Sequence, residues 1–519
     1  MDRFHVPRGT RDFPPDEMVV RNYVERVVRD TFESFGFQQI QTPTFESFDL
    51  FAARSGEEIR ESMFIFASDA GRYALRPELT APVCRLVVSG TLSKTDPPTP
   101  FPYKLYYLGP CFRYCKPQAG RYREFFQVGT ELIGASGELA DAEVIALAVK
   151  VLRRLNIPGC QLKIGNVGIF QKLLSQQNGN GGQLRQDWEL DVIHDIDHLV
   201  HTTEMCEAIA QRAERRQANI QDDIAFVSST RSFLYHIQDR IDYSGDSEIR
   251  PNEDVSSHNL CEQAESLPKV AEDTFLEKWT TELSLPEEMG RLLLEVSHLR
   301  GPGAAVIPQA KDLLAGTDAM ESLDNLSRVV EELASFGVTG FEVVLGIVRN
   351  LDFYTGTVFE IDSALLGAQK QVCGGGRYDN LVKEFGGESM PATGFAFGFD
   401  RLVKAFKEAK NDEGMSRAPV DVLVIYPEGL RSASVKIAEL LRDSGLRAAV
   451  DLCGRSIEDQ KEYAGKLGAK YSVVIDETSA EKVKLREKVR TGIEETELPV
   501  SALVGEITRR IKSETNSGN

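Results

Sequence analysis

The chain has 519 residues, enough for roughly two to four domains, and 42% are hydrophobic and 27% charged, a balance typical of globular proteins. Its formal net charge of −19 argues against a protein that coats nucleic acid indiscriminately, because such binding needs clustered lysine and arginine. Neither a membrane-spanning apolar run nor an N-terminal signal core is present, so we expect a cytoplasmic protein without membrane contact. The eight cysteines are scattered, which favours free thiols.

The N-terminal part predicts one helix followed by a β-rich block. Apolar residues recur at helical spacing over about 16–35, at Val20, Val24, Val27, Val28 and Phe35. Four β-like segments joined by turns then predict an antiparallel sheet: FQQIQTP, YALRP, KLYYLGPCFRY and EFFQVGTELIG. A helix at AEVIALAVKVLRRL, a strand at QLKIGN and the loop NGNGG follow.

The middle of the chain, near 190–340, is mostly polar with helical periodicity, and its acidic stretch SGDSEIRPNEDVSS predicts a mobile loop. We interpret this region as an inserted helical subdomain. From about 341 the β pattern returns, in FEVVLGIVRN, GTVFEID, QVCGGGRYDNLV and TGFAFGFDRLV.

The C-terminal part has a different organisation. Residues 408–419 are charged and lack periodicity, which indicates a linker. Beyond them strands alternate with helices, from DVLVIYP through SASVKIAELLRDSG and LRAAVDL to KYSVVIDE. This alternation predicts a small α/β domain with a largely parallel sheet.

The densest chemical signal is FRYCKPQAGRYREFFQVGTELIG, residues 112–134. Arg113, Arg121 and Arg123 surround a turn between two β-like arms, and Phe125 follows them. Guanidinium groups are forked donors that stay charged, which suits a nucleotide triphosphate, and a phenyl ring can stack on a purine. An exposed hairpin with solvated charges is the alternative.

Three later segments carry weaker signals. Arg349 lies in the apolar strand pattern of GIVRNLDFYTGTVFE, where it either serves a ligand or pairs structurally with Asp352. The consecutive glycines of VCGGGRYDNLV allow close approach of backbone or ligand, or form a plain turn. In ATGFAFGFDRLV, two glycines precede Arg401, and the pattern is not a Walker A loop.

Together these segments resemble the histidine–tRNA ligases, a class II aminoacyl-tRNA synthetase family. PRGTRDFPPDEM is similar to that family's N-terminal signature, and GFQQIQTPTFE to class II motif 1. LRPELTAPVCR, the 112–134 segment and GFAFGFDRL are similar to the LRPE segment, motif 2 and motif 3. IVRNLDFYTGTVFE and GGGRYDNLV resemble segments peculiar to the histidine enzymes. The resemblance covers nearly the whole chain and is weakest across about 200–320.

The resemblance implies an α+β catalytic domain with the antiparallel class II synthetase sheet, a helical insertion and a C-terminal α/β anticodon-binding domain. We place the catalytic domain at 1–200 plus 325–407 and the insertion at 201–324, where it would clamp the tRNA acceptor arm. The linker would be 408–419 and the anticodon-binding domain 420–519. A homodimer is also implied, since motif 1 usually builds the dimer interface.

For the amino acid, the resemblance implies that Glu78 and Thr80 grip the α-amino group. Glu131 and Tyr354 would bond the imidazole nitrogens, since a site built on hydrogen bonds rejects ligands that lack them. The expected histidine-binding residues are Glu78, Thr80, Gln127, Glu131, Arg349, Phe353, Tyr354 and Tyr378.

For ATP, the resemblance implies that Arg113 and Arg349 flank the α-phosphate while the histidine carboxylate attacks it. No protein nucleophile is needed, because catalysis comes from positioning and from cations placed where charge develops. We expect ATP with Mg²⁺, and no metal ligated by the protein alone. The expected ATP-binding residues are Arg113, Arg121, Arg123, Phe125 and Arg401, the catalytic residues Arg349, Arg113 and Gln127, and the contacts to the tRNA acceptor end Lys116 and Gln118.

Departures from the family pattern leave every expected ligand side chain in place. Cys115 stands where motif 2 usually has an acid, which would affect ATP affinity because a thiol is a weak acceptor. Phe126, Asn350, Phe353 and Asp400 also differ from the usual residues.

Two rival functions remain open from the sequence. One is a catalytically inactive relative, such as the regulatory subunit of ATP phosphoribosyltransferase or a sensor of uncharged tRNA; the C-terminal domain and the retained arginines weigh against it. The other is a metalloenzyme, because VIHDIDHLVH places His194, His198 and His201 at helical spacing beside Asp195. The apolar residues between them favour an ordinary packing helix.

Overall fold

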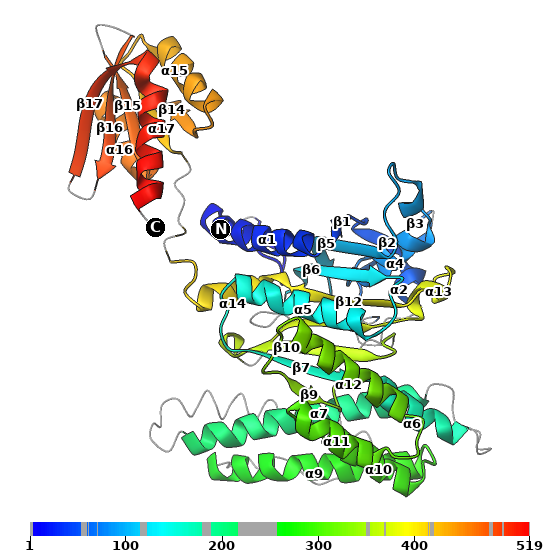
Figure 1. Cartoon of the computed structure of the whole chain (residues 1–519). Helices are drawn as coiled ribbons and strands as arrows, with labels where there is room; N and C mark the ends of the chain where they lie inside the picture. The colour runs from blue at the N-terminus through cyan, green and yellow to red at the C-terminus, as the bar shows by residue number, and fades with distance from the viewer. Residues whose placement is uncertain are drawn as a thin grey trace. The chain divides into compact units, whose positions relative to one another are not determined.

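The computed structural model describes residues 4–52, 60, 62–69, 71–114, 122–178, 188–215, 257–348, 353–367, 370–413, 415, 420–476, 481–489 and 492–517. The chain divides into two compact units, Met1–Asp412 and Glu413–Asn519 (Figure 1), and each is described by itself. The division falls inside the segment expected to be a linker. None of the described helices combines the length and the apolar character needed to cross a bilayer.

Within the described residues, the first unit is built on a nine-stranded sheet in the order β1-β5-β6-β12-β11-β10-β7-β9-β8. Neighbouring strands are antiparallel, as predicted, except that β1 with β5 and β7 with β9 are parallel. The strands are β1 (Gln38–Gln39), β5 (Tyr103–Phe112), β6 (Glu124–Ile133), β7 (Cys160–Asn166), β8 (Arg300–Gly301), β9 (Glu342–Val344), β10 (Thr357–Ser363), β11 (Gln371–Arg377) and β12 (Ala392–Gly398).

A separate small sheet corrects one prediction, because YALRP does not join the large sheet. Its strands are β2 (Phe45–Ser47), β3 (Ile65–Ser68) and β4 (Gly71–Leu75), in the order β2-β4-β3. The strands are short and mostly exposed. A strand-like composition therefore identified a strand here, but not the sheet to which it belongs.

One face of the large sheet is covered by helices and packed with aromatic rings. These helices are α1 (Pro15–Ser34), α5 (Glu138–Arg154) and α14 (Phe399–Glu408), which contact one another or the strands β6, β11 and β12 (Figure 1). Phe32 of α1 lies edge-on against Tyr106 and Phe395, with ring centroids 5.6 and 5.8 Å apart. Of the predicted apolar stripe, Val20, Val24 and Val28 are buried, whereas Val27 and Phe35 are only partly buried.

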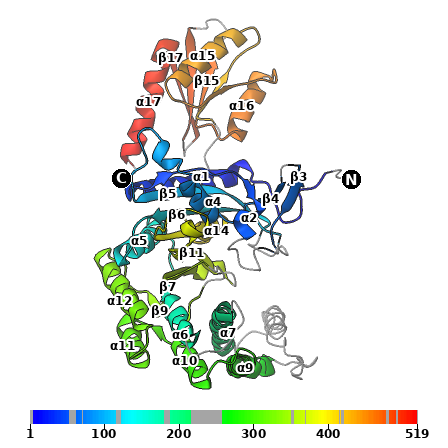
Figure 2. The ribbon, with the colours of Figure 1, turned by 90° about the vertical axis from the view of Figure 1, so that its right-hand side faces the viewer.

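The remaining helices of the first unit lie mainly beside the β7-β9-β8 edge of the sheet (Figures 1 and 2). In α7, Glu204 forms ion pairs with Lys163 of β7 and with Lys370, which joins this helix to the sheet. The acidic stretch 244–256 and the loop 179–182 lie outside the described residues. These helices are α6 (Gly168–Asn178), α7 (Trp188–Arg215), α9 (Ser257–Thr281), α10 (Glu287–Ser297), α11 (Gly303–Leu313) and α12 (Met320–Ser335); shorter ones elsewhere in the unit are α2 (Phe48–Ala52), α4 (Thr80–Val88) and α13 (Leu381–Glu384).

The second unit is an α/β domain with its own apolar core, as predicted. Its described strands form the order β14-β13-β15-β16-β17, of which the first three are parallel and β16 and β17 antiparallel. The predicted largely parallel sheet is thus only part of the sheet, because the charged final hairpin gives a weak strand signal. The elements are β13 (Val422–Ile425), α15 (Arg431–Asp443), β14 (Ala448–Val450), α16 (Ile457–Lys466), β15 (Tyr471–Ile475), β16 (Lys482–Val489), β17 (Gly492–Pro499) and α17 (Val500–Ser517).

Candidate active site

The face of the large sheet opposite α1 is lined by glycines, and we call it the glycine-rich face. Directly opposed residues of antiparallel strands point to the same side of a sheet. Register therefore places on one side the residues Gly109, Gly129, Gly374, Gly376, Gly394 and Gly398, together with Tyr107, Gln127 and Glu131. The glycine triplet that could have formed a plain turn is part of strand β11. Glycines let other groups lie close to the backbone, and a Cβ at Gly109 would lie 2.3 Å from Arg76 Nη2.

Glu131 is the centre of a buried polar cluster on this face. Its side chain is only 1% exposed, and it is hydrogen-bonded by Thr80 Oγ1 at 2.8 Å and by Tyr107 Oη at 3.1 Å. Tyr378 Oη bonds its other oxygen. Glu78 is also buried, where it accepts hydrogen bonds from the backbone N–H groups of Thr80 and Ala81 at the start of α4. Two buried carboxyl groups thus lie at one end of the glycine-rich face.

Close packing around Glu131 explains why glycines occur in these strands. A Cβ at Gly394, which is paired with Glu131 across β12 and β6, would lie 1.9 Å from Glu131 Oε2. At Gly129 a Cβ would lie 2.6 Å from Tyr107 Oη. Any side chain at either position would displace the carboxyl group or the phenol, since real Cβ contacts of this length do not occur.

Burial changes the protonation of both carboxyl groups. Desolvation raises the pKa of Glu131 to about 8, although hydrogen bonds from Tyr378 and Thr80 oppose the shift, and the nearby Glu78 adds to it. Desolvation also raises the pKa of Glu78, against the backbone N–H donors and the Arg113 charge. Burial therefore favours the neutral form of Glu131 when no ligand is bound, and a cationic or N–H-bearing ligand would favour the ionised form.

Aromatic side chains line this part of the site. Phe353 lies edge-on to Tyr378, with ring centroids 5.6 Å apart, and 4.9 Å from the ring of Tyr354. All three are less than a tenth exposed. The backbone carbonyl of Tyr354 accepts a hydrogen bond from Gln171 of α6. Six of the residues expected to bind the amino acid are thus gathered here: Glu78, Thr80, Glu131, Phe353, Tyr354 and Tyr378.

Arg113, Phe125 and Gln127 lie further along the same pair of strands. Arg113 Nε donates to the Pro77 carbonyl at 3.0 Å, next to Glu78, and its guanidinium lies 5.4 Å from the centre of the Phe125 ring. Gln127 lies four residues before Glu131 in β6, on the same face of the sheet, and accepts a hydrogen bond from the Cys111 thiol. A ligand could therefore contact the Glu131 cluster and Arg113 at once.

The other two described arginines of the expected ATP site have different surroundings. Arg123 stacks on Tyr114 at 4.1 Å, and its Nη1 donates to the Arg8 carbonyl. Arg401 Nη1 donates to the Gln371 carbonyl at 2.9 Å, at the end of β11 opposite Tyr378. Arg401 thus lies roughly 20 Å along the strand direction from the Glu131 cluster, about the length of a seven-residue strand. This separation would suit the far end of an extended nucleotide.

Seven residues singled out from the sequence lie outside the described residues. They are Cys115, Lys116, Gln118, Arg121, Arg349, Asn350 and Asp352, so their expected roles, and the alternative pairing of Arg349 with Asp352, stay predictions. Conversely, sequence reasoning missed Tyr107, which bonds Glu131 directly. Alternation along KLYYLGPCFRY could have found it, because Tyr107 shares a face with Gly109 and, through the register, with Gly129.

The histidine-rich helix has an ordinary structural explanation for its acid. Asp195 accepts hydrogen bonds from Trp279 Nε1 and Lys278 Nζ, each at 2.9 Å, and so joins α7 to α9. Over the part of the chain that the structure describes, no group of three or more His, Cys, Asp or Glu side chains could hold a metal ion.

Comparison with known proteins identifies the family. The sequence profile described as "Histidyl-tRNA synthetase" matches residues 9–231 and 264–402. The histidine–tRNA ligase of Archaeoglobus fulgidus is 36% identical over 484 residues, which are 92% of this chain and 94% of that protein. The chain belongs to the histidyl-tRNA synthetase family. The ligase of Methanocaldococcus jannaschii is 33% identical over 491 residues, 93% of this chain and 95% of that one.

The histidyl-tRNA synthetase resemblance stated from the motifs is thereby confirmed. An "Anticodon binding domain" profile matches residues 421–510. Among solved structures, the synthetase of S. aureus has a TM-score of 0.62 at 24% identity and covers 97% of this chain and 99% of that one. The synthetase from Nostoc sp. PCC 7120 gives 0.64 at 21%, covering 98% and 99%. These structures support the predicted α+β fold with its C-terminal domain.

Proposed function

We propose that this chain activates L-histidine with ATP, forming histidyl-adenylate and diphosphate, and transfers the histidyl group to the 3′ end of tRNA(His). The observation that carries the proposal is the buried Glu78–Thr80–Glu131–Tyr378 cluster on the glycine-rich face, within an established histidyl-tRNA synthetase fold. Two buried carboxyl groups disfavour an empty site and favour a ligand with an ammonium group and N–H donors. Histidine supplies both.

The test is ATP–pyrophosphate exchange with each of the standard amino acids in turn. We expect exchange with histidine alone, because an apolar side chain would leave the buried groups unpaired. Folded protein that shows no exchange with any amino acid would overturn the proposal and favour a histidine- or tRNA-sensing relative, with Cys115 the first residue to replace. Exchange with several amino acids would contradict the role of Glu131.

For ATP, we propose that Arg113 and Arg349 bind the α-phosphate, Phe125 stacks on the adenine and Arg121, Arg123 and Arg401 contact the remainder. Mg²⁺ would arrive with the triphosphate, since it usually keeps phosphate and water oxygens as ligands. Support comes from the position of Arg113 beside both Phe125 and Glu78. Removal of divalent cations by a chelator should abolish exchange, and added Mg²⁺ should restore it.

For tRNA, we propose that Lys116 and Gln118 contact the acceptor end and that the second unit binds the anticodon. The match of residues 421–510 to an anticodon-binding profile supports the second part. The predicted cytoplasmic location is consistent with this role and stays a prediction.

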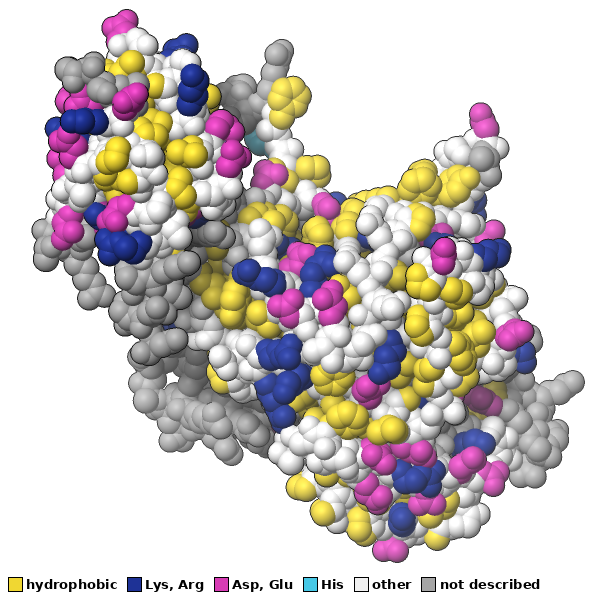
Figure 3. Space-filling view, turned by 45° about the horizontal axis from the view of Figure 1, so that its top comes forward, with side chains coloured by type: hydrophobic (Ala, Val, Ile, Leu, Met, Phe, Trp, Pro, Cys, Tyr) yellow, Lys and Arg dark blue, Asp and Glu magenta, His cyan; other side chains and the backbone are white. Residues whose placement is uncertain are grey.

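We also propose a homodimer. The small sheet exposes apolar side chains, with Phe45, Ile65 and Phe66 each more than 40% exposed and Tyr73 stacked against Phe66. Hydrophobic side chains are visible in patches on the larger unit (Figure 3). Such patches mark interaction surfaces. Sedimentation should give twice the chain mass, and a fully active monomer would contradict the proposal.

A further inference from the structure

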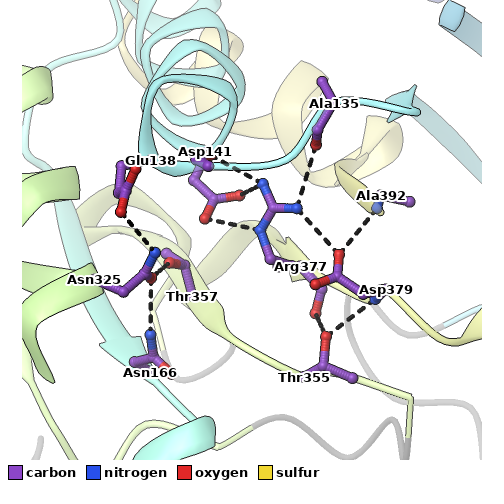
Figure 4. Close-up of polar contacts among 11 residues, drawn as sticks. Ala135, Glu138, Asp141, Asn166, Asn325, Thr355, Thr357, Arg377, Asp379 and Ala392 are labelled. Carbon is purple, nitrogen blue, oxygen red and sulfur yellow. Dashed lines mark hydrogen bonds and ion pairs between the residues drawn. The ribbon is translucent and has the colours of Figure 1, made fainter. Parts of the chain in front are cut away.

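Arg377 occupies the back of the sheet directly behind the Glu131 cluster. Side chains alternate along a strand, so Tyr378 reaches the glycine-rich face while its neighbour Arg377 points to the opposite side, toward α5. The guanidinium is buried, 6% exposed, and lies between two carboxylates (Figure 4). Its Nε and Nη2 contact both oxygens of Asp141 at 3.1 and 2.7 Å, and Nη1 contacts Asp379 at 3.0 Å.

The same guanidinium also holds the backbone of the segment that leads into α5. Nη1 and Nη2 donate to the carbonyls of Ala135 and Gly137 at 3.3 and 3.1 Å. All three nitrogens of the guanidinium group therefore have hydrogen-bond partners. Such a buried pair is weak support for stability, because desolvation offsets its attraction, but it fixes geometry.

Thr355 connects this network to the segment that carries Phe353 and Tyr354, whose rings line the site. Its backbone N–H donates to the Arg377 carbonyl at 2.8 Å. Its hydroxyl accepts from the Asp379 N–H at 3.0 Å and donates to the Arg377 carbonyl at 3.5 Å (Figure 4). Asp379 in turn accepts from the Ala392 N–H on β12 at 3.1 Å. The strand end that carries Tyr378 is thus tied to the segment that carries Phe353 and Tyr354.

We propose that Arg377 and Thr355 are positioning residues for the amino-acid pocket, which hold Tyr378 and the Phe353–Tyr354 pair against Glu131 without touching substrate. The proposal rests on the proposed function, because it assigns this pocket to histidine. Arg377 and Thr355 adjoin Tyr378 and the segment that carries Phe353 and Tyr354, rather than Arg113 and Phe125. We therefore expect this network to affect the affinity for histidine and to leave the affinity for ATP unchanged.

Thr355→Val removes the hydroxyl and keeps the shape, whereas Thr355→Ser keeps the hydroxyl. Histidine affinity is measured by calorimetry, and the KM values of histidine and ATP by pyrophosphate exchange. We expect Thr355→Val to weaken histidine binding about five- to tenfold, the effect of losing the hydrogen bond from the Asp379 N–H, because the bond to the Arg377 carbonyl is long. The KM of ATP should be unchanged and Thr355→Ser should be near wild type. Arg377→Lys should act in the same direction, since one ammonium cannot replace the fork.

Leu147→Ala, a buried residue of the same helix as Asp141, controls for lost stability. It should lower the melting temperature and leave histidine affinity unchanged. Wild-type histidine affinity in Thr355→Val overturns the inference, as do equal increases in both KM values. If the wild-type protein binds histidine but shows no exchange, the proposed function is contradicted and this inference still holds. If the wild-type protein does not bind histidine, both are contradicted.

Discussion

At the residue scale, Glu131 is the side chain whose chemistry depends most on its surroundings. A carboxyl group with a folded pKa of about 8 and an unfolded value near 4.5 binds its proton more tightly in the folded state. The stability that this proton contributes is complete below about pH 4.5 and is lost as pH rises through about 8. The pH dependence of stability that comes from Glu204 has the opposite sign, because Lys163 lowers the pKa of Glu204 to about 2 despite burial.

Glu131→Gln should therefore flatten the pH dependence of folding stability. Between pH 5.5 and 7.5, Glu131 should lower the wild-type free energy of unfolding by roughly 2 kcal/mol, a change that glutamine cannot show. Urea unfolding of both proteins at the two pH values measures the difference. Equal slopes for the two proteins would mean that Glu131 is ionised in the folded protein.

Arg349→Ala should reduce histidine-dependent exchange by at least about a hundredfold, because its proposed partner is the charge that develops at the α-phosphate. The fold should be intact, as judged by circular dichroism and melting temperature. Arg291→Ala is the matched control, since Arg291 forms an exposed helical pair with Glu287. Near-normal turnover in Arg349→Ala would remove the residue from the catalytic set.

At the scale of elements, register creates the site. The strands β5, β6, β12 and β11 bring Tyr107, Glu131 and Gly394 to one face, while Phe395 and Phe397 pack on the other. Each strand alone contributes only a few of the residues that make up the site. A shift of one residue in any of them would turn its residues to the opposite face of the sheet.

Gly394→Ala tests this arrangement. Its Cβ would lie 1.9 Å from Glu131 Oε2, so the carboxyl group must move, and we expect histidine-dependent exchange to fall by at least tenfold. Gly505→Ala in α17, where a Cβ would meet nothing within 4 Å, is the matched control and should behave as wild type. Unchanged exchange in Gly394→Ala would show that Glu131 is not fixed in this position.

At the scale of the molecule, the proposed active site and the proposed anticodon contact belong to different units. The Glu131 cluster lies in Met1–Asp412, and the second unit has a separate apolar core. A chain that ends at 412 should keep histidine-dependent exchange within a few-fold of the full chain. It should lose most tRNA charging, because the anticodon-binding contribution to affinity is gone.

Aminoacylation with tRNA(His) transcript, measured beside exchange, separates the two effects. A folded 1–412 chain that charges tRNA as fast as the full chain would contradict the proposed role of the second unit. One without exchange, where the full chain has it, would show that the two units depend on each other.

Motifs within single segments were sufficient to predict the family, the predominantly antiparallel sheet and the C-terminal α/β domain. Glu78, Thr80, Glu131 and Tyr378 were also predicted, on the resemblance of their segments to family motifs. These features could be predicted because hydrophobic period, glycine runs and local motifs are properties of contiguous sequence.

Only the tertiary structure showed that Tyr107 bonds Glu131 and that YALRP joins a separate small sheet. It also showed that Arg377 and Thr355 connect the strand end that carries Tyr378 to the segment that carries Phe353 and Tyr354. The elevated pKa of Glu131 belongs to the same class, since it arises from burial among groups distant in the chain. Sheet membership, burial and contacts such as the one between Arg377 and Asp141, 236 residues apart, depend on long-range pairing. No local pattern encodes that pairing, because the free energy that selects it comes from packing the whole chain.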